Sequence, residues 1–173
     1  MSGSAILSQC ETWRYRLERT LNSSSGPVAA IIGVNPSTAD AKVDDQTIRK
    51  DIGFGRRLGW SRIIKGNLFA YRATDVRKLK DVVDPIGPDN DMHLEQIFRD
   101  ADVLIAAWGP KAKLPRRLQP RYLEIIRIAD RVAKPLLCFG RSGDGMPRHT
   151  LMLPYATPLE VWRGVDLFAG VRP

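Results

Sequence analysis

Cysteine and long apolar segments are scarce in this 173-residue sequence, and each scarcity excludes a class of protein. The two cysteines, Cys10 and Cys138, stand far apart in the chain, which argues against a disulfide framework or a zinc motif. No apolar run approaches the roughly 20 residues that span a bilayer. The first residues lack the basic start, apolar stretch and cleavage site of a secretory signal. We therefore expect a cytoplasmic protein without a membrane segment.

The composition favours one globular domain over residues 1–173. Hydrophobic residues make up 43% of the chain, which is enough to bury a continuous core without metals or cross-links. Lys and Arg number 27 against 19 Asp and Glu, so the formal net charge is +8. Such an excess favours a polyanionic partner, nucleic acid above all, although many basic proteins bind none.

Apolar runs that end at Gly, Asn or Pro alternate with segments of helical spacing. The runs are typical of buried strands, and they cover Val28–Val34, Ile63–Tyr71, Val103–Trp108 and Pro135–Phe139. Apolar residues recur at three- and four-residue intervals in Thr47–Leu58, His93–Ala101 and Arg121–Ala133. This order predicts an α/β fold, a three-layer sandwich with a central, mainly parallel four-stranded sheet. The segment Thr12–Leu21 fits a helix or an edge strand.

The segments that follow the predicted strands are polar, and they begin at Asn35, Asn67, Trp108 and Gly140. In parallel sheets such exits converge at one edge, where ligands bind. We therefore expect a site there, built around Gly33-Val34-Asn35-Pro36-Ser37. The Gly-rich stretch Gly140–Gly145 lacks the spacing of a phosphate or dinucleotide loop, so no ATP, NAD or other cofactor and no metal is expected.

Several segments resemble a bacterial and phage family catalogued as DUF1643, among them GVNPSTADAKVDDQT, NLFAYRATD, PIGPDNDMHL and MPRHTLML. The GVNPS segment is also similar to the GINPG motif of the mismatch-specific branch of the uracil-DNA glycosylase superfamily. MPRHTL takes the place of that superfamily's second motif, with Thr150 after His149 where a proline is usual. This remote resemblance implies a glycosylase-like fold with a four-stranded parallel core and the hydrolysis of a damaged or modified base from DNA by a monomer.

The resemblance gives roles to three residues. Asn35 would position the attacking water, and His149 would stabilise the departing base. Asn67 would read the extruded base through its amide. Each has a simpler explanation: Asn35 opens a turn, Asn67 ties two loops together, and His149 is a solvated loop histidine.

Other candidates surround these three. Gly33, Pro36 and Ser37 would contact the substrate, with Phe54 and Tyr71 as aromatic residues beside the base. Asp40 is a second candidate for activating water, and it would then displace Asn35 from that role. Asp44 or Asp45 is expected to cap the helix that follows.

A set of basic residues is expected to contact DNA phosphates without sequence preference: Arg72, Lys111, Lys113, Arg116, Arg117 and Arg148. The short motifs GVNPS and MPRHTL contain no lysine, which disfavours a Schiff-base mechanism and favours a monofunctional enzyme. Two alternatives remain. One is a nucleic-acid-binding module of the same fold without catalysis, and the other is a hydrolase of free nucleotides or nucleosides.

Overall fold

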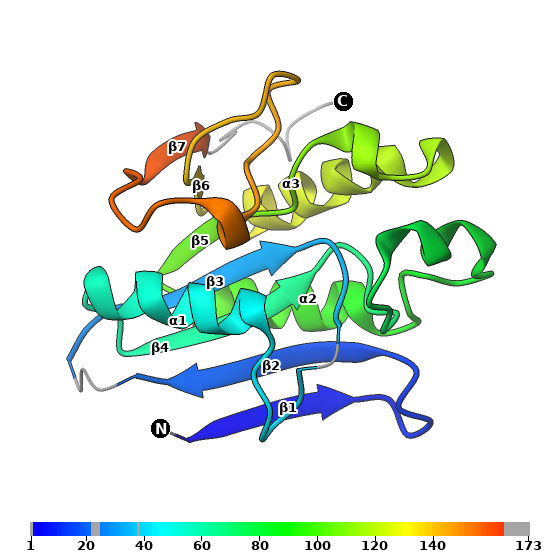
Figure 1. The fold of residues 1–173 in the computed structure, drawn as a ribbon, viewed down its shortest axis with the longest axis horizontal. Helices are drawn as coiled ribbons and strands as arrows, with labels where there is room; N and C mark the ends of the chain where they lie inside the picture. The colour runs from blue at the N-terminus through cyan, green and yellow to red at the C-terminus, as the bar shows by residue number, and fades with distance from the viewer. Residues whose placement is uncertain (1, 22–24, 38, 165–173) are drawn as a thin grey trace.

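The computed structural model describes residues 2–21, 25–37 and 39–164. Within these ranges one mixed sheet of seven strands runs through the molecule in the order β1-β2-β4-β3-β5-β6-β7 (Figure 1). The strands are β1 (Gly3–Leu7), β2 (Arg14–Thr20), β3 (Val28–Gly33), β4 (Arg62–Asn67), β5 (Val103–Ala106), β6 (Leu136–Cys138) and β7 (Glu160–Arg163).

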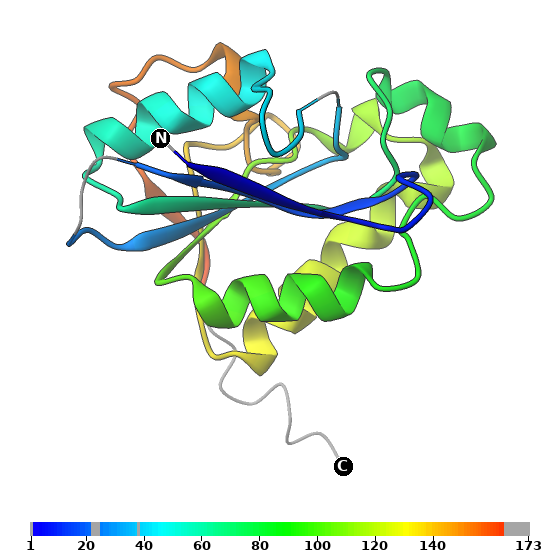
Figure 2. The ribbon, with the colours of Figure 1, turned by 90° about the horizontal axis from the view of Figure 1, so that it is seen from below.

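The predicted strands form the centre of this sheet, where β4, β3, β5 and β6 pair in parallel. Helix α1 (Gln46–Arg57) covers one face, and α2 (Asn90–Asp100) and α3 (Tyr122–Arg131) cover the other (Figure 2). Side chains of β3 alternate between the two cores, with Ile31 packed on the α1 side and Ile32 on the α2 side. The predicted α/β class and the helices are therefore confirmed, with helix ends that shift by one to three residues.

The predicted four-stranded sheet was too small. β1, β2 and β7 pair antiparallel with their neighbours and extend both edges. These strands were hard to detect because none of them is a continuous apolar run. β1 begins with Gly3 and Ser4, β2 is rich in charge, and β7 begins and ends with a charged residue. The segment Thr12–Leu21 contains β2, which lies inside the sheet between β1 and β4 and is not an edge strand.

The residues next to α1 predicted where this helix begins, but the short 3₁₀ helices elsewhere in the chain were not predicted. The Asp45 side chain accepts a hydrogen bond from Ile48 N at 2.9 Å, which confirms the predicted cap. The basic segment after β5 contains two 3₁₀ helices, η2 (Lys111–Lys113) and η3 (Arg116–Arg121). Two further 3₁₀ helices are η1 (Val76–Asp81), after β4, and η4 (Thr150–Met152), after β6.

Candidate functional site

A cavity of about 600 Å³ opens at the carboxyl ends of the parallel strands. The chain leaves β3 toward α1 on one face of the sheet and leaves β5 toward α3 on the other (Figures 1 and 2). In open α/β sheets, ligands bind where neighbouring connections turn to opposite faces in this way. The volume falls within the roughly 300–1,000 Å³ of small-molecule sites. Its lining comes from all the predicted strand exits and includes Gly33, Asn35, Ser37, Lys65, Asn67, Trp108, Lys113 and His149.

Asn35 joins the loop after β3 to the loop after β4. Its Nδ2 donates to the carbonyl oxygens of Ala73 at 2.7 Å and Pro36 at 3.0 Å. Ala73 N in turn donates to Pro36 O at 2.9 Å. The amide is thus held in one orientation, and Oδ1, which accepts no hydrogen bond from the described residues, can accept one from a water molecule.

Asn67 has a different environment. The residue is 2% exposed, and its Nδ2 has no hydrogen-bond partner among the residues that the structure describes. In the register of β3 and β4, Gly33 lies beside Asn67, and a Cβ on Gly33 would stand 3.1 Å from Asn67 Oδ1. The loop-tying hydrogen bonds belong to Asn35, whereas Asn67 lines the cavity with a buried amide nitrogen that no described residue satisfies. A buried donor without a partner is costly unless a ligand or water supplies an acceptor.

His149 forms the N-cap of η4, where its Nδ1 accepts a hydrogen bond from Leu151 N at 3.2 Å. A nitrogen that accepts cannot carry the proton, so the neutral ring bears its hydrogen on Nε2. Burial, reinforced by the positive charge of Lys65, lowers the pKa of His149 to about 4. The residue is therefore a neutral hydrogen-bond donor at neutral pH.

The structure adds a buried ion pair that the sequence reasoning missed. Lys65 Nζ lies 2.7 Å from Asp51 Oδ2, and Lys65 lines the cavity. Lys65 lies on β4, outside the motifs GVNPS and MPRHTL, so those motifs did not point to it. The available signal was a charged residue inside an otherwise apolar run, since Lys and Asp are seldom fully buried unless they are paired.

Some predicted residues lie elsewhere. Asp40 does not line the cavity, and its Oδ1 accepts hydrogen bonds from Lys42 N at 2.7 Å and Val43 N at 2.9 Å, which lowers its pKa. Phe54 is 0% exposed and stacks on Phe139 with ring centroids 4.2 Å apart, inside the core between α1 and the sheet. Neither residue reaches the place where a ligand would bind. Pro36 is buried in the β3 exit loop.

A second, smaller hollow adjoins the cavity and shares Ser37, Ala73 and Thr74 with it. Tyr71 lines this hollow and not the main cavity. Arg72 and Lys78 also line the hollow and make it basic. The arrangement offers cationic and hydroxyl groups next to the main cavity, which suits a phosphate.

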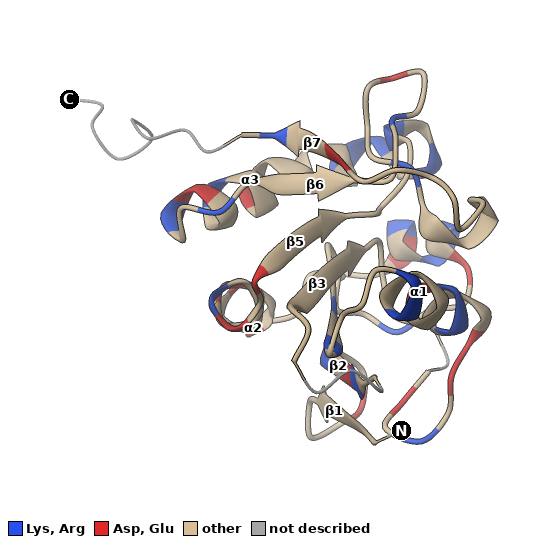
Figure 3. Cartoon of the chain, turned by 90° about the vertical axis from the view of Figure 1, so that its left-hand side faces the viewer, with Lys and Arg blue, Asp and Glu red and all other residues tan. Residues whose placement is uncertain are grey.

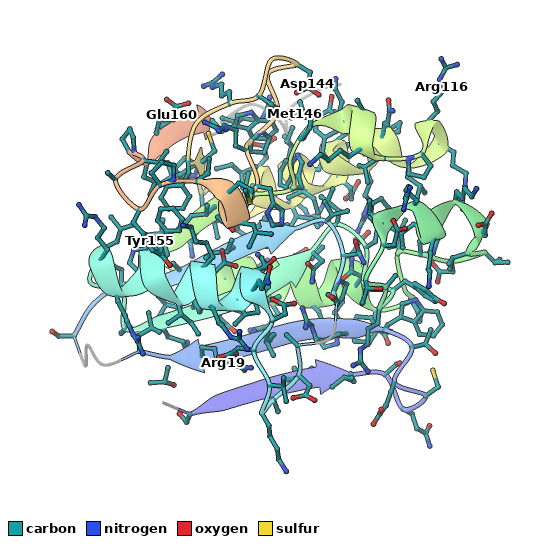
Figure 4. The ribbon with its side chains drawn as sticks, viewed as in Figure 1. Arg19, Arg116, Asp144, Met146, Tyr155 and Glu160 are labelled. Atoms are coloured by element: carbon teal, nitrogen blue, oxygen red, sulfur yellow. The ribbon has the colours of Figure 1, made fainter. Side chains whose placement is uncertain are left out.

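Some of the predicted DNA-contacting side chains are exposed at the surface, and others make contacts within the protein. Arg116 projects from the surface on η3, and Arg148 is exposed as well (Figure 4). Arg117 Nη2 donates to the carbonyl oxygens of Leu79, Lys80 and Val82, so it joins η3 to η1. Lys113 lines the cavity, and Lys111 lies over the Tyr122 ring at 5.6 Å.

The loop after β6, which Asp144 and Met146 mark in Figure 4, is attached to the loop after β5. Asp144 Oδ2 accepts a hydrogen bond from Lys111 N at 2.8 Å. Several Lys and Arg segments lie on the side to which the arrowheads of β3, β5 and β6 point (Figure 3). The site edge is therefore a joined set of loops with a basic rim.

The described ranges contain neither a metal-binding cluster nor a membrane-spanning helix. In the described ranges, no three His, Cys, Asp or Glu side chains gather so that they could hold a metal ion. None of the helices there combines the length and apolar character that crossing a bilayer requires.

Comparison with known proteins gives a family and no function. No curated protein and no solved structure matches the chain. The model of one family, described as a protein of unknown function (DUF1643), matches residues 14–151. Because that match covers most of the sequence, the chain belongs to the DUF1643 family.

Proposed function

We propose that this protein is a DNA glycosylase that hydrolyses the N-glycosidic bond of a damaged or modified base. The observation that carries the proposal is the convergence of Asn35, Asn67 and His149, from the exits of three strands, on one cavity. The parallel strands at the centre of the sheet support a relation to the uracil-DNA glycosylase superfamily. The cavity volume suits an extruded base with part of its sugar.

The three side chains divide the chemistry between them. As the bond from the sugar C1′ to the base nitrogen breaks, its electron pair moves to the base, and the oxygen of a water molecule bonds to C1′. Asn35 Oδ1 accepts a hydrogen bond from this water and orients it; the water proton passes to bulk solvent. His149 Nε2–H donates to the departing base, and Asn67 Nδ2 donates to an acceptor on its edge.

The basic rim serves the same substrate. Lys113 at the cavity and Arg72 and Lys78 at the adjoining hollow lie where the phosphates beside an extruded nucleotide would pass. Contacts of this kind hold any sequence and release counterions, so affinity for DNA should fall steeply as salt rises.

The test is an assay for abasic sites in oligonucleotides that carry uracil, mismatched thymine or hypermodified pyrimidines. The wild-type protein should release at least one of these bases. In Asn35→Ala, base release should collapse while DNA affinity changes little. His93→Ala is the matched control, because this second histidine lies on α2 and stacks on Tyr15, away from the cavity.

The other outcomes identify the alternatives. Tight DNA binding with no base release from any substrate would make the protein a binding module. Release of bases from free nucleosides, with weak and salt-insensitive DNA binding, would make it a nucleoside hydrolase.

A further inference from the structure

A buried row of polar side chains lies at the floor of the cavity. Asp51 of α1 accepts from Lys65 Nζ through Oδ2 at 2.7 Å and from the Thr150 hydroxyl through Oδ1 at 2.6 Å. Asp51 and Thr150 are 0% exposed and Lys65 is 4% exposed. Thr150 directly follows His149, so the row links α1, β4 and the start of η4.

Fold stability alone is a weak explanation for the buried ion pair of Lys65 and Asp51. Removing two charges from water costs about as much as their attraction returns, and apolar residues of similar volume are often as stable. The two partners also differ in how many of their hydrogen-bonding groups are paired. Both Asp51 oxygens are bonded, whereas the Lys65 ammonium has three N–H groups and, among the described residues, one hydrogen-bond acceptor.

Lys65 lines the cavity, so a ligand bound there lies next to this side chain. A Cβ on Gly33 would stand 3.2 Å from Lys65 Cε and 3.4 Å from Nζ, so the lack of a side chain on Gly33 leaves space beside the ammonium group. Asn67 Nδ2 and Trp108 Nε1 are buried donors without partners in the described part of the chain, and both residues line the same cavity. A floor with these donors fits a ligand that presents acceptors or negative charge.

We propose that Lys65 is a catalytic residue of this cavity: its ammonium, held by Asp51, binds the part of the departing base on which negative charge collects. The inference rests on the proposed function, because the base receives the electron pair of the broken bond. Lys65 adds a full positive charge to the neutral donor that His149 supplies. Preorganised charge of this kind acts strongly in a site that excludes water.

Binding of free bases tests the proposal without requiring catalysis. Uracil, 5-fluorouracil and 5-nitrouracil lose their ring N–H protons with increasing ease, so at one mildly alkaline pH they differ in anionic fraction. Calorimetry should show that the wild-type protein binds 5-nitrouracil about tenfold or more tightly than uracil, the gain typical of a hydrogen bond to a charged group.

The informative variant combines Lys65→Met with Asp51→Asn, since Lys65→Met alone leaves a buried carboxylate unpaired. Its preference for 5-nitrouracil should fall close to parity with uracil. The matched control combines Arg16→Met with Asp100→Asn, which removes an ion pair of 2.7 Å that does not line the cavity. This control should keep the wild-type preference.

Two results would overturn the inference. One is an equal preference for the anion in the Lys65 double variant and in wild type. The other is a borohydride-trapped protein–DNA adduct that depends on Lys65, because the amine would then be a nucleophile. If no DNA substrate loses a base but the anion preference still depends on Lys65, the proposed function fails while the assignment of Lys65 as the anion-binding group of the cavity stands.

Discussion

The arginines of β2 and the lysine of β4 are buried cations on neighbouring strands of one sheet, but their partners differ. Arg19 donates to Asp44 Oδ1 at 2.7 Å, to Asp40 O at 2.5 Å and to Glu18 O at 2.8 Å. Arg14 Nη1 donates to Ala39 O in the same loop. Lys65, in contrast, has one carboxylate partner and lies at the cavity.

This difference separates two uses of buried charge. On β2, the guanidinium groups of Arg14 and Arg19 hold residues 39–44, the segment that leads into α1, by bonding its carbonyl and carboxylate oxygens. At the end of β4, the ammonium is fixed by one partner and keeps donors for a ligand. The first region shapes the loop beside the site, and the second forms part of the site.

The largest expected effect is the loss of stability in Lys65→Met. This substitution leaves the fully buried Asp51 carboxylate without its cation, which should cost about 3–5 kcal/mol of unfolding free energy. Urea unfolding measures the change. Adding Asp51→Asn should recover most of it, and a double variant as unstable as the single one would show that the charge is not the cause.

The next effect concerns His149. His149→Asn keeps an oxygen that can cap η4, since Asn is a preferred N-cap residue, but it removes the Nε2–H donor. We expect base release to slow by about 10²–10³-fold, the usual cost of losing one charge-stabilising donor. Single-turnover kinetics measure the rate, and an unchanged rate would remove His149 from the mechanism.

Acid should weaken the fold through the same histidine. Its folded-state pKa of about 4 lies below its ordinary value of 6.5, so the unfolded chain takes up the proton first as pH falls. Stability should therefore decrease from about pH 6.5 to about pH 4, by at most about 3 kcal/mol from this group, and this contribution should be fully present above that window. Urea unfolding at several pH values should show a smaller decrease for His149→Asn.

Arg19→Met tests the other side of the comparison. The side chain of Asp44 is 18% exposed and can be hydrated when it loses its partner, so the cost should be about 1–3 kcal/mol. The preference for 5-nitrouracil over uracil should persist in this variant, because Lys65 is untouched. Loss of that preference would mean that the two regions are not separate.

The smallest effect belongs to the rim. Arg116→Ala should leave stability within about 0.5 kcal/mol, because the side chain is exposed. It should lower the slope of log DNA affinity against log salt by about 1 if the residue contacts a phosphate. Arg57→Ala, an exposed position at the far end of α1, is the control and should leave the slope unchanged.

Sequence reasoning succeeded where the signal was local. The apolar runs located the parallel strands, and the polar residues after them located the edge that carries the cavity. The cap formed by Asp45 also followed from adjacent residues. The burial of Phe54 could not be predicted from adjacent residues, because Phe54 packs on Phe139, which follows β6 and is distant in the sequence.

The chain order alone determined the α/β class and brought Asn35, Asn67 and His149 to one edge, because parallel strands place their exits together. Only the tertiary structure decided what each side chain does there. The pairing of Lys65 with Asp51 joins a strand to a helix, and the choice between Asn35 and Asn67 for tying loops depends on where Ala73 lies. Such contacts arise from the packing of separate elements, which no local pattern in the sequence records.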